Sequence, residues 1–314
     1  MKRLTCHIVF ILILCFFPQS KASSSTDNSA SRFWDYIYSN FKLLPELHFD
    51  ADLTTYFFHK NDFFRQRYFF SNTTNLEFVF ISYKWIYSVW HIQFHNGMGQ
   101  TPGNNVFDPM DVDYCLDPTI EFRIPWCIVT TGIDHHCFHE IDRRDQPTVY
   151  FNQGFLEAKS NNSDLFEYWK GLAKEGSPHL NERISWDGRL GFYPRSFFGL
   201  VAPNKINGIN PYTWDIRGEG RYEFYKRHSW FFALKLNSLL GYYKGTSENP
   251  AGNGIYWRQD FTLENYFSKG MKGAMMFVTY TFDDLPKYIN ITGTEQLPRF
   301  SQDRLLKVGV RFFL

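Results

Sequence analysis

The sequence predicts an all-β protein, a transmembrane antiparallel β-barrel of about 12 strands. Apolar and polar residues alternate with a period of two in one segment after another, as in strands with two different faces. Aromatic residues make up 20 % of the chain, and many lie near the ends of the apolar faces, as the girdles of a membrane barrel do. A soluble sandwich would alternate in the same way, but its apolar faces would pack inward.

Residues 1–22 are expected to be a signal peptide. Lys2 and Arg3 precede the short apolar run His7–Phe17, and Ser20-Lys21-Ala22 fits a small-x-small cleavage site. The run is too short to be a good transmembrane helix, and no later segment is long and apolar enough either. If the exported chain enters a membrane, it therefore does so as strands.

Residues 23–62 are expected to form a linker and a short helix ahead of the barrel. The run SSSTDNSAS is typical of a disordered linker. The spacing of Phe33, Ile37, Phe41 and Leu44 is nearly helical. This helix could simply pack against the barrel, or it could act as a plug or an interfacial anchor.

Residues 63–314 are assigned to the barrel. The expected strands are 63–71, 75–83, 85–96, 111–124, 126–137, 147–159, 182–194, 211–226, 229–243, 254–267, 272–283 and 304–314. Short connections at 227–228 and 268–271 alternate with long ones, as in outer-membrane barrels. The connection 160–181 is long where a short one is expected. Its SDLFEYWKGLAKEG run indicates either a short interfacial helix or an additional strand.

The final segment, LLKVGVRFFL, carries the one resemblance to a known class of protein. Leu306, Val308, Val310, Phe312 and Leu314 share its apolar face. Lys307, Gly309, Phe312 and Leu314 resemble the terminal recognition signal of bacterial outer-membrane barrels, except that such barrels usually end in Phe. The resemblance implies a porin-like protein of the cell envelope, inserted into the outer membrane by the barrel-assembly machinery and surrounded by outer-membrane lipid.

Charged side chains are expected to line the lumen, because an Arg or Lys at the lipid midplane costs about 2–4 kcal/mol. The candidate lumen residues are Asp187, Arg189, Asp215, Arg217, Glu219, Arg221, Arg258, Asp260 and Glu264. Acidic and basic residues mix on these faces, so an open pore and a plugged or paired interior both remain open. The formal net charge of +1 gives no electrostatic reason to expect nucleic acid as a partner.

The run GIDHHCFHEIDRRD is the one dense cluster of residues that could carry chemistry. His135, Cys137 and His139 would share one face of a strand, and such nitrogen and sulfur ligands suit zinc or copper. The remaining candidate ligands, expected at the same mouth of the barrel, are His136, His91, His95 and Asp113. The simpler interpretation is that these groups pair with Arg143, Arg144 and water. A Cys115–Cys137 disulfide would leave Cys127 as the odd thiol.

The predicted function is a channel or binding barrel for a small polar solute. The first alternative is an outer-membrane hydrolase of lipid or lipopolysaccharide, which would need a serine beside a histidine base. Ser88 and His91 lie on opposite faces of their strand, and the sequence has no Gly-x-Ser-x-Gly motif. The second alternative is a structural or surface-interaction barrel with a blocked lumen.

Overall fold

A computed structural model describes eleven stretches of the chain: residues 36, 39–59, 69–100, 106–141, 149–162, 183–193, 212–227, 230–243, 254–269, 272–283 and 303–313, the first being a single residue followed by a gap. Met1–Asn40 and Phe41–Leu314 form two separate compact units. The expected signal peptide and the expected helix within 163–176 lie outside the described residues. No helix among the described residues is both long and apolar enough to cross a membrane.

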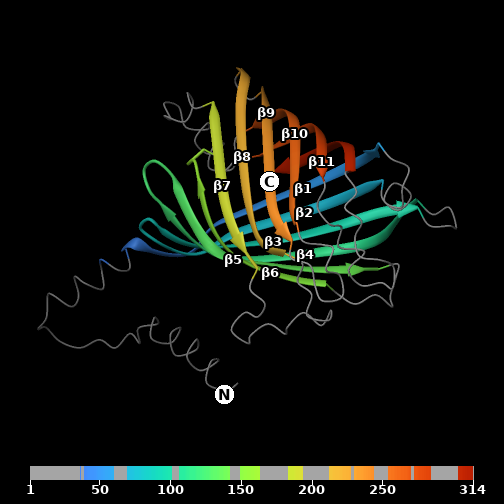
Figure 1. The fold of residues 1–314 in the computed structure, drawn as a ribbon. Helices are drawn as coiled ribbons and strands as arrows, with labels where there is room; N and C mark the ends of the chain where they lie inside the picture. Colours follow the sequence, from blue (N-terminus) through green and yellow to red (C-terminus); the bar gives the residue numbers. More distant parts are fainter. Residues whose placement is uncertain are drawn as a thin grey trace, which may run out of the picture. The chain divides into compact units, whose positions relative to one another are not determined.

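Twelve antiparallel strands form a closed barrel (Figure 1), which confirms the predicted fold class. Each strand pairs with its neighbours in sequence, and β1 also pairs with β12. The strands are β1 Phe41–Phe58, β2 Phe70–Tyr83, β3 Ile86–Gln100, β4 Val106–Arg123, β5 Ile128–Glu140, β6 Val149–Lys159, β7 Ile184–Phe192, β8 Tyr212–Arg227, β9 Trp230–Tyr243, β10 Gly254–Lys269, β11 Lys272–Asp283 and β12 Asp303–Phe313. Because these strands form a closed barrel, they have no sheet edge with unpaired backbone N–H and C=O groups. Lipid could not supply hydrogen bonds to such groups.

The first hairpin differs from the sequence prediction. One strand, β2 at Phe70–Tyr83, contains the whole of the expected strand 75–83 and also residues 70–71 of the expected strand 63–71, most of which lies outside the described residues. The partner strand that was not expected is β1, at Phe41–Phe58. A β-bulge between Leu43 and Glu46 interrupts the alternation of β1, and Leu44 has a positive φ of 48°. Because the bulge breaks the period-two alternation, the apolar residues Phe41 and Leu44 lie three positions apart, a spacing that is also typical of one face of a helix. Helical backbone is found before β1, at Tyr36, Ser39 and Asn40.

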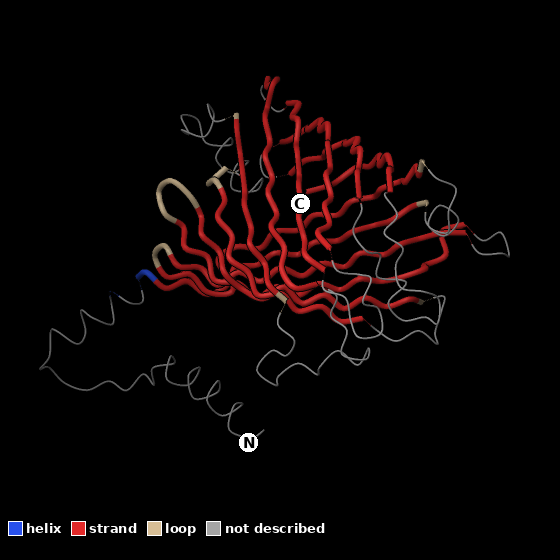
Figure 2. The backbone as a smooth tube through the Cα atoms, viewed as in Figure 1, coloured by secondary structure: helices blue, strands red, loops and turns tan. Residues whose placement is uncertain are grey.

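The other ten expected strands overlap β3–β12 one for one, and the largest difference is at β4, which begins at Val106 rather than at 111. Figure 2 shows the described chain as almost entirely strand, with few turns. A short turn at Lys84 and Trp85 joins β2 to β3, and only two residues separate β8 from β9 and β10 from β11 in the sequence. Because neighbouring strands run in opposite directions, the strand ends next to these short connections lie at the same end of the barrel as Phe41 and Phe313, which we call the short-turn end.

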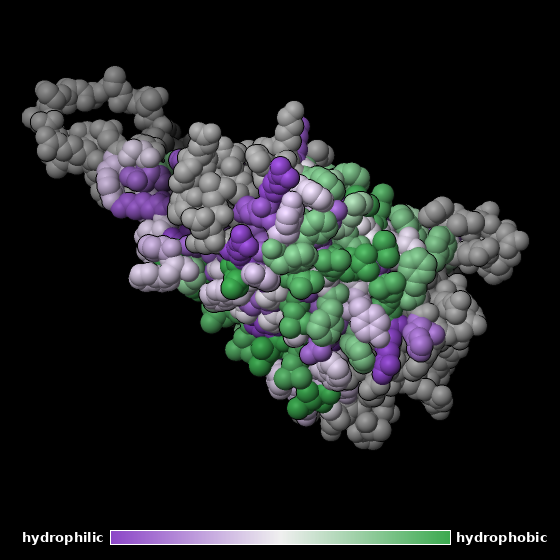
Figure 3. Space-filling model, turned by 90° about the horizontal axis from the view of Figure 1, so that it is seen from above, coloured by the Kyte–Doolittle hydropathy of each residue, from purple (hydrophilic) through white to green (hydrophobic). Residues whose placement is uncertain are grey.

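The apolar faces of the strands point outward. On β8, Ile216 and Tyr222 are 48 % and 46 % exposed, whereas Asp215 and Glu223 are 2 % and 1 % exposed. On β12, Phe312 points outward while Phe313 is buried inside the barrel. Apolar side chains form a broad area across the outer surface seen in Figure 3. An exterior of this kind suits hydrocarbon and would be unfavourable in water.

Aromatic side chains fill part of the barrel interior at the short-turn end. Phe231, Tyr266, Met275 and Phe313 form a buried cluster, with Phe277 packed against it. The Phe231 and Tyr266 rings stack with their centroids 4.5 Å apart. This cluster joins β9, β10, β11 and β12 inside the barrel.

Candidate functional site

The lumen contains a cavity of about 540 Å³. Two walls of opposite charge line it. Strands β1–β5 contribute the carboxylates of Asp50, Glu77, Asp117 and Asp134 and the imidazoles of His48, His91 and His136, and we call this side the acidic wall. Strands β6–β9 contribute Lys159, Arg189, Arg217, Arg221 and Lys235, with Glu157 and Glu219, and we call this side the basic wall.

Most cations of the basic wall are paired with a carboxylate but still reach the cavity. Lys235 Nζ lies 2.6 Å from Glu219 Oε2, and the Lys235 side chain remains 27 % exposed. Arg217 Nη2 lies 3.3 Å from Asp215 Oδ2, and its side chain remains 33 % exposed. The walls therefore present charge to the cavity rather than neutralising all of it among themselves.

The candidate lumen residues fall into two groups. Arg189, Arg217, Glu219, Arg221 and Glu264 line the cavity. The other four, Asp187, Asp215, Arg258 and Asp260, do not line it. Asp215 pairs with Arg217 and Asp260 pairs with Arg258, whereas Asp187 lies opposite Glu219 in the strand register.

Asp215 illustrates this supporting role. Its Oδ2 atom accepts hydrogen bonds from Gln153 and Tyr193, both at 2.8 Å. Asp260 accepts hydrogen bonds from Arg258 at 3.0 Å and from Thr281 at 2.5 Å. These carboxylates hold their neighbours in place along the strand faces.

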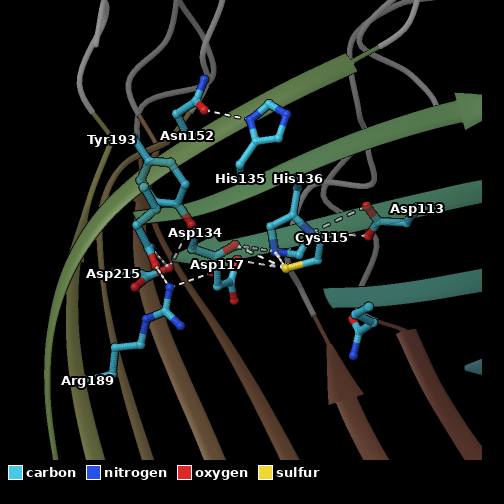
Figure 4. Close-up of polar contacts among 12 residues, drawn as sticks. Asp113, Cys115, Asp117, Asp134, His135, His136, Asn152, Arg189, Tyr193 and Asp215 are labelled. Atoms are coloured by element: carbon cyan, nitrogen blue, oxygen red, sulfur yellow. Dashed lines mark hydrogen bonds and ion pairs between the residues drawn. The ribbon is translucent and has the colours of Figure 1, made fainter. Parts of the chain in front are cut away.

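The histidine cluster is divided between the two faces of β5. His139 packs edge-on against Tyr114, which is 41 % exposed on the outer surface, and its Nε2 atom lies 2.9 Å from Cys137 Sγ. His135 lies on the same face, but its Nδ1 atom is 2.7 Å from the side chain of Asn152. Figure 4 shows His135 turned toward Asn152, away from His136. The sequence-based ligand set is therefore not a single site.

His136 points into the lumen. Its Nδ1 atom lies 3.3 Å from Asp113 Oδ2, and its Nε2 atom lies 2.6 Å from Asp134 Oδ1. In the strand register, Cys115 pairs with His136 and Asp113 pairs with Phe138. Asp113 thus reaches His136 diagonally rather than directly across the strand pair.

The two remaining histidines of the expected site have partners of their own. His91 Nδ1 lies 3.0 Å from Glu77 Oε2, and the register places His91 opposite Asp117 on β4. His95 lies nearer the end of β3 and is 3.0 Å from the hydroxyl of Thr73. His91 lines the cavity and His95 does not. Ser88 pairs with outward-facing Ile120, so it is on the face of β3 opposite His91.

The three cysteines among the described residues, Cys115, Cys127 and Cys137, form no disulfide. The expected Cys115–Cys137 disulfide does not form, because Cys115 faces the lumen while the residue that pairs with Cys137 is outward-facing Tyr114. Side chains on opposite faces of neighbouring strands cannot meet the geometry of a disulfide.

Four lumen residues lie close together, and we call them the lumen cluster: Cys115, Asp117, Asp134 and His136 (Figure 4). Of these, sequence reasoning named only His136 as a candidate ligand. Cys115 Sγ lies 3.0 Å from Asp117 Oδ1, 3.6 Å from Asp134 Oδ1 and 3.6 Å from His136 Nε2. The signal was present as Cys-x-Asp on β4 and Asp-x-His on β5. Recognising it needed the register of this strand pair, since a shift of one residue would reverse every face.

Comparison with known proteins found bacterial outer-membrane barrels among the solved structures. The NanC porin is 10 % identical over 85 % of this chain and 100 % of its own, with a TM-score of 0.42. The Salmonella typhi outer membrane phospholipase dimer with bound calcium is 9 % identical over 86 % of this chain and 91 % of its own, with a TM-score of 0.44. The KdgM porin is 8 % identical over 84 % of this chain and 98 % of its own, with a TM-score of 0.40.

No protein-family model matches the chain. No curated protein matches it in sequence. The neighbours include both porins and a phospholipase, so they do not distinguish one activity from another.

Proposed function

We propose that this chain is a barrel of the bacterial outer membrane whose lumen binds or conducts a small polar solute. The observation that carries the proposal is the cavity of about 540 Å³ between the acidic wall and the basic wall. A blocked structural barrel would not need charged side chains that remain partly exposed to an interior space, as Arg217 and Lys235 do.

The two walls favour a solute that carries both signs of charge or a strong dipole. One unit charge acts on another with about 0.5 kcal/mol at about 8 Å in water, and more where protein replaces water. Several charges on each wall therefore add to a preference large enough to orient a small solute across the lumen. Such a solute would exchange its hydration water for carboxylate, guanidinium and imidazole groups, as in other polar pores.

Single-channel recording in a planar lipid bilayer tests this proposal. We expect the purified protein to give discrete conductance steps in KCl, whereas a sealed interior would give no current. The lumen is then probed with Glu157→Trp, because Glu157 lines the cavity, and we expect the step size to fall. A full-sized step in this variant, or the absence of steps in the wild type, would overturn conduction through the lumen and leave only a binding barrel.

The adjacent residue provides a matched control. Leu156 points outward and is 55 % exposed, so Leu156→Trp adds the same bulk to the lipid side of the same strand. We expect its conductance to equal that of the wild type. An equal loss in both variants would mean that the tryptophan disturbs the strand rather than the lumen.

A further inference from the structure

The lumen cluster has the donors of a metal site. Cys115, Asp134 and His136 each offer one ligand atom, and these three atoms all lie within 4.8 Å of one another. Thiolate, imidazole and carboxylate together are the ligand set of zinc and related cations, whereas magnesium and calcium take oxygen ligands. We propose that the lumen cluster binds a thiophilic divalent cation of the Zn²⁺ class. The site does not depend on whether the lumen conducts.

The distances agree with tetrahedral coordination. With Zn–S at about 2.3 Å and Zn–N or Zn–O at about 2.0 Å, a tetrahedral angle separates sulfur from either lighter ligand by about 3.5 Å. Cys115 Sγ lies 3.6 Å from both Asp134 Oδ1 and His136 Nε2. Those two atoms are 2.6 Å apart because they share a hydrogen bond, so a cation would replace that bond and separate them slightly.

We assign Asp117 as the fourth donor, although its carboxylate lies outside the three-residue group whose ligand atoms are mutually within 4.8 Å. Its Oδ1 atom lies 3.0 Å from Cys115 Sγ, and both residues are on the lumen face of β4, two positions apart. Two strands thus contribute two ligands each, with Cys115 and Asp117 from β4 and Asp134 and His136 from β5. Because β4 and β5 are hydrogen-bonded neighbours, the sheet holds these pairs in register.

Neighbouring residues orient the ligands as they do in known metal sites. Asp113 lies 3.3 Å from His136 Nδ1, which directs the Nε2 atom toward the cluster. A carboxylate on the far nitrogen of a ligand histidine is the usual outer-shell arrangement for zinc. Arg189 holds the other oxygen of Asp134, Oδ2, and leaves Oδ1 for the cation.

The surroundings favour a cation that can exchange with the cavity. Asp134 is 2 % exposed and Cys115 is 7 % exposed, yet both line the cavity, so the ligands are shielded but reachable. The acidic wall carries Asp50 and Glu77 in the same cavity, with no Lys or Arg from β1–β5 among its lining residues. Its field would concentrate divalent cations near the cluster.

Cobalt spectroscopy on the full mature chain in detergent tests the proposal. Co²⁺ substitutes for Zn²⁺ and reports a thiolate ligand by a near-ultraviolet charge-transfer band and tetrahedral geometry by strong visible bands. We expect both at one equivalent of Co²⁺, and we expect Zn²⁺ to remove them. Absence of the thiolate band from the folded wild type would overturn the proposal.

Two serine variants locate the site. Cys115→Ser should abolish the thiolate band, whereas Cys137→Ser should keep it, because Cys137 lies with His139 on the outer face. If Cys137→Ser loses the band and Cys115→Ser keeps it, the cation binds at the outer pair and the lumen site is wrong. Heat-modifiable migration in detergent gels shows whether each variant is folded.

Asp113→Asn tests the orienting role of Asp113. It leaves all four proposed ligands in place, and we expect Co²⁺ to bind roughly 10-fold more weakly with the same absorption spectrum. Unchanged affinity would show that Asp113 does not orient a metal-bound His136. Loss of the thiolate band in this variant would show that the ligand set itself is different.

Discussion

Arg221 is the most enclosed cation of the basic wall. Its side chain is 6 % exposed and lies 2.8 Å from Glu264 Oε2 and 3.0 Å from Glu223 Oε1. The guanidinium carbon is also 4.8 Å from the centre of the Tyr266 ring. Arg221 therefore pairs with two buried carboxylates beside the aromatic cluster, one of which, Glu223, also lies 3.5 Å from Lys226 Nζ. Removing Arg221 would leave Glu264 buried without this ion pair.

Arg221→Met should destabilise the barrel. Removing one partner of a buried ion pair costs about 3–5 kcal/mol, because the other charge remains buried without compensation. We expect the unfolding midpoint in urea, followed by tryptophan fluorescence in lipid vesicles, to fall accordingly. Adding Glu264→Gln to the same chain should recover much of the loss, which mere loss of packing would not allow, while Glu223 keeps its contact with Lys226.

Arg258 gives the matched comparison. It pairs with Asp260 at 2.9 Å, but its side chain is 35 % exposed. Exposed pairs contribute about 0–1 kcal/mol, so Arg258→Met should shift the midpoint much less. If Arg221→Met and Arg258→Met shifted the unfolding midpoint equally, burial of the ion pair would not determine how much stability its removal costs.

At the level of single residues, the sequence indicated which face of a strand a side chain lies on but not which side chains it contacts. Alternation alone places Arg189, Arg217 and Arg221 on a polar face, and the structure places all three along the cavity. It could not show that Arg189 reaches Asp134 on β5, since that contact depends on the curvature of the barrel. The lumen cluster was missed for the same reason: its members come from two strands whose register the sequence leaves open.

Among the elements, β12 depends on the close approach of its neighbours at one glycine. A Cβ atom at Gly309 would come within 2.6 Å of the backbone oxygen of Leu53 on β1 and 2.3 Å of the Phe277 ring on β11. Gly309 thus lies where β12 joins β1 to β11. The glycine of the terminal signal therefore has a packing role in this barrel.

Gly309→Ala should weaken closure of the barrel. The backbone oxygen of Leu53 cannot move without disturbing the β1–β12 ladder, and overpacking of this kind costs about 1–3 kcal/mol. We expect the temperature at which the folded band is lost in detergent gels to fall. Gly188→Ala on β7 is the control, because an added Cβ there meets nothing within 4 Å.

An unchanged temperature for Gly309→Ala, or an equal fall for Gly188→Ala, would contradict the proposed role of the contact. A general effect of alanine in a strand would be the same at both positions, since glycine in a strand interior is mildly unfavourable anyway.

Strand prediction succeeded where polar and apolar faces differed strongly and failed where they did not. β8, β9 and β10 alternate along most of their length, and their expected bounds agree closely with the structure. β1 contains a bulge, and the outer end of β2 has Asn72 and Thr74 on its lipid side and Ser71 and Thr73 on its lumen side. Period-two alternation is invisible where both faces are polar or the register shifts.

For the whole molecule, the separation of charge across the lumen is a property that no single strand has. Most strands of the basic wall carry both signs, and the two walls face each other only because the sheet closes. The sequence showed a net charge of +1 and mixed polar faces, so the opposing walls could not be predicted from it.

Reversing one charge on the basic wall should change the ion selectivity of the pore. Lys235→Glu changes the charge of the basic wall by two units. At about 0.5 kcal/mol per unit of charge, this change should raise the permeability ratio of cations to anions roughly five-fold. The reversal potential in a KCl gradient measures this ratio. The shift should shrink at 1 M salt, where the Debye length is about 3 Å.

Asp50→Asn on the acidic wall is the counterpart and should shift the reversal potential in the opposite direction. Shifts of the same sign in the two variants, or no dependence on salt, would mean that the two walls do not set the selectivity.

The seam between β1 and β12 also constrains how the protein reaches its final state. Arg311 and Asp52 are 3.0 Å apart in space but separated by 259 positions along the chain. Bringing such distant segments together carries a large loss of chain entropy before any contact compensates for it, which makes native topologies of this kind slow to form. Until that last ladder joins, two exposed strand edges remain open to wrong partners, so this polypeptide should need protection from aggregation between its synthesis and its insertion.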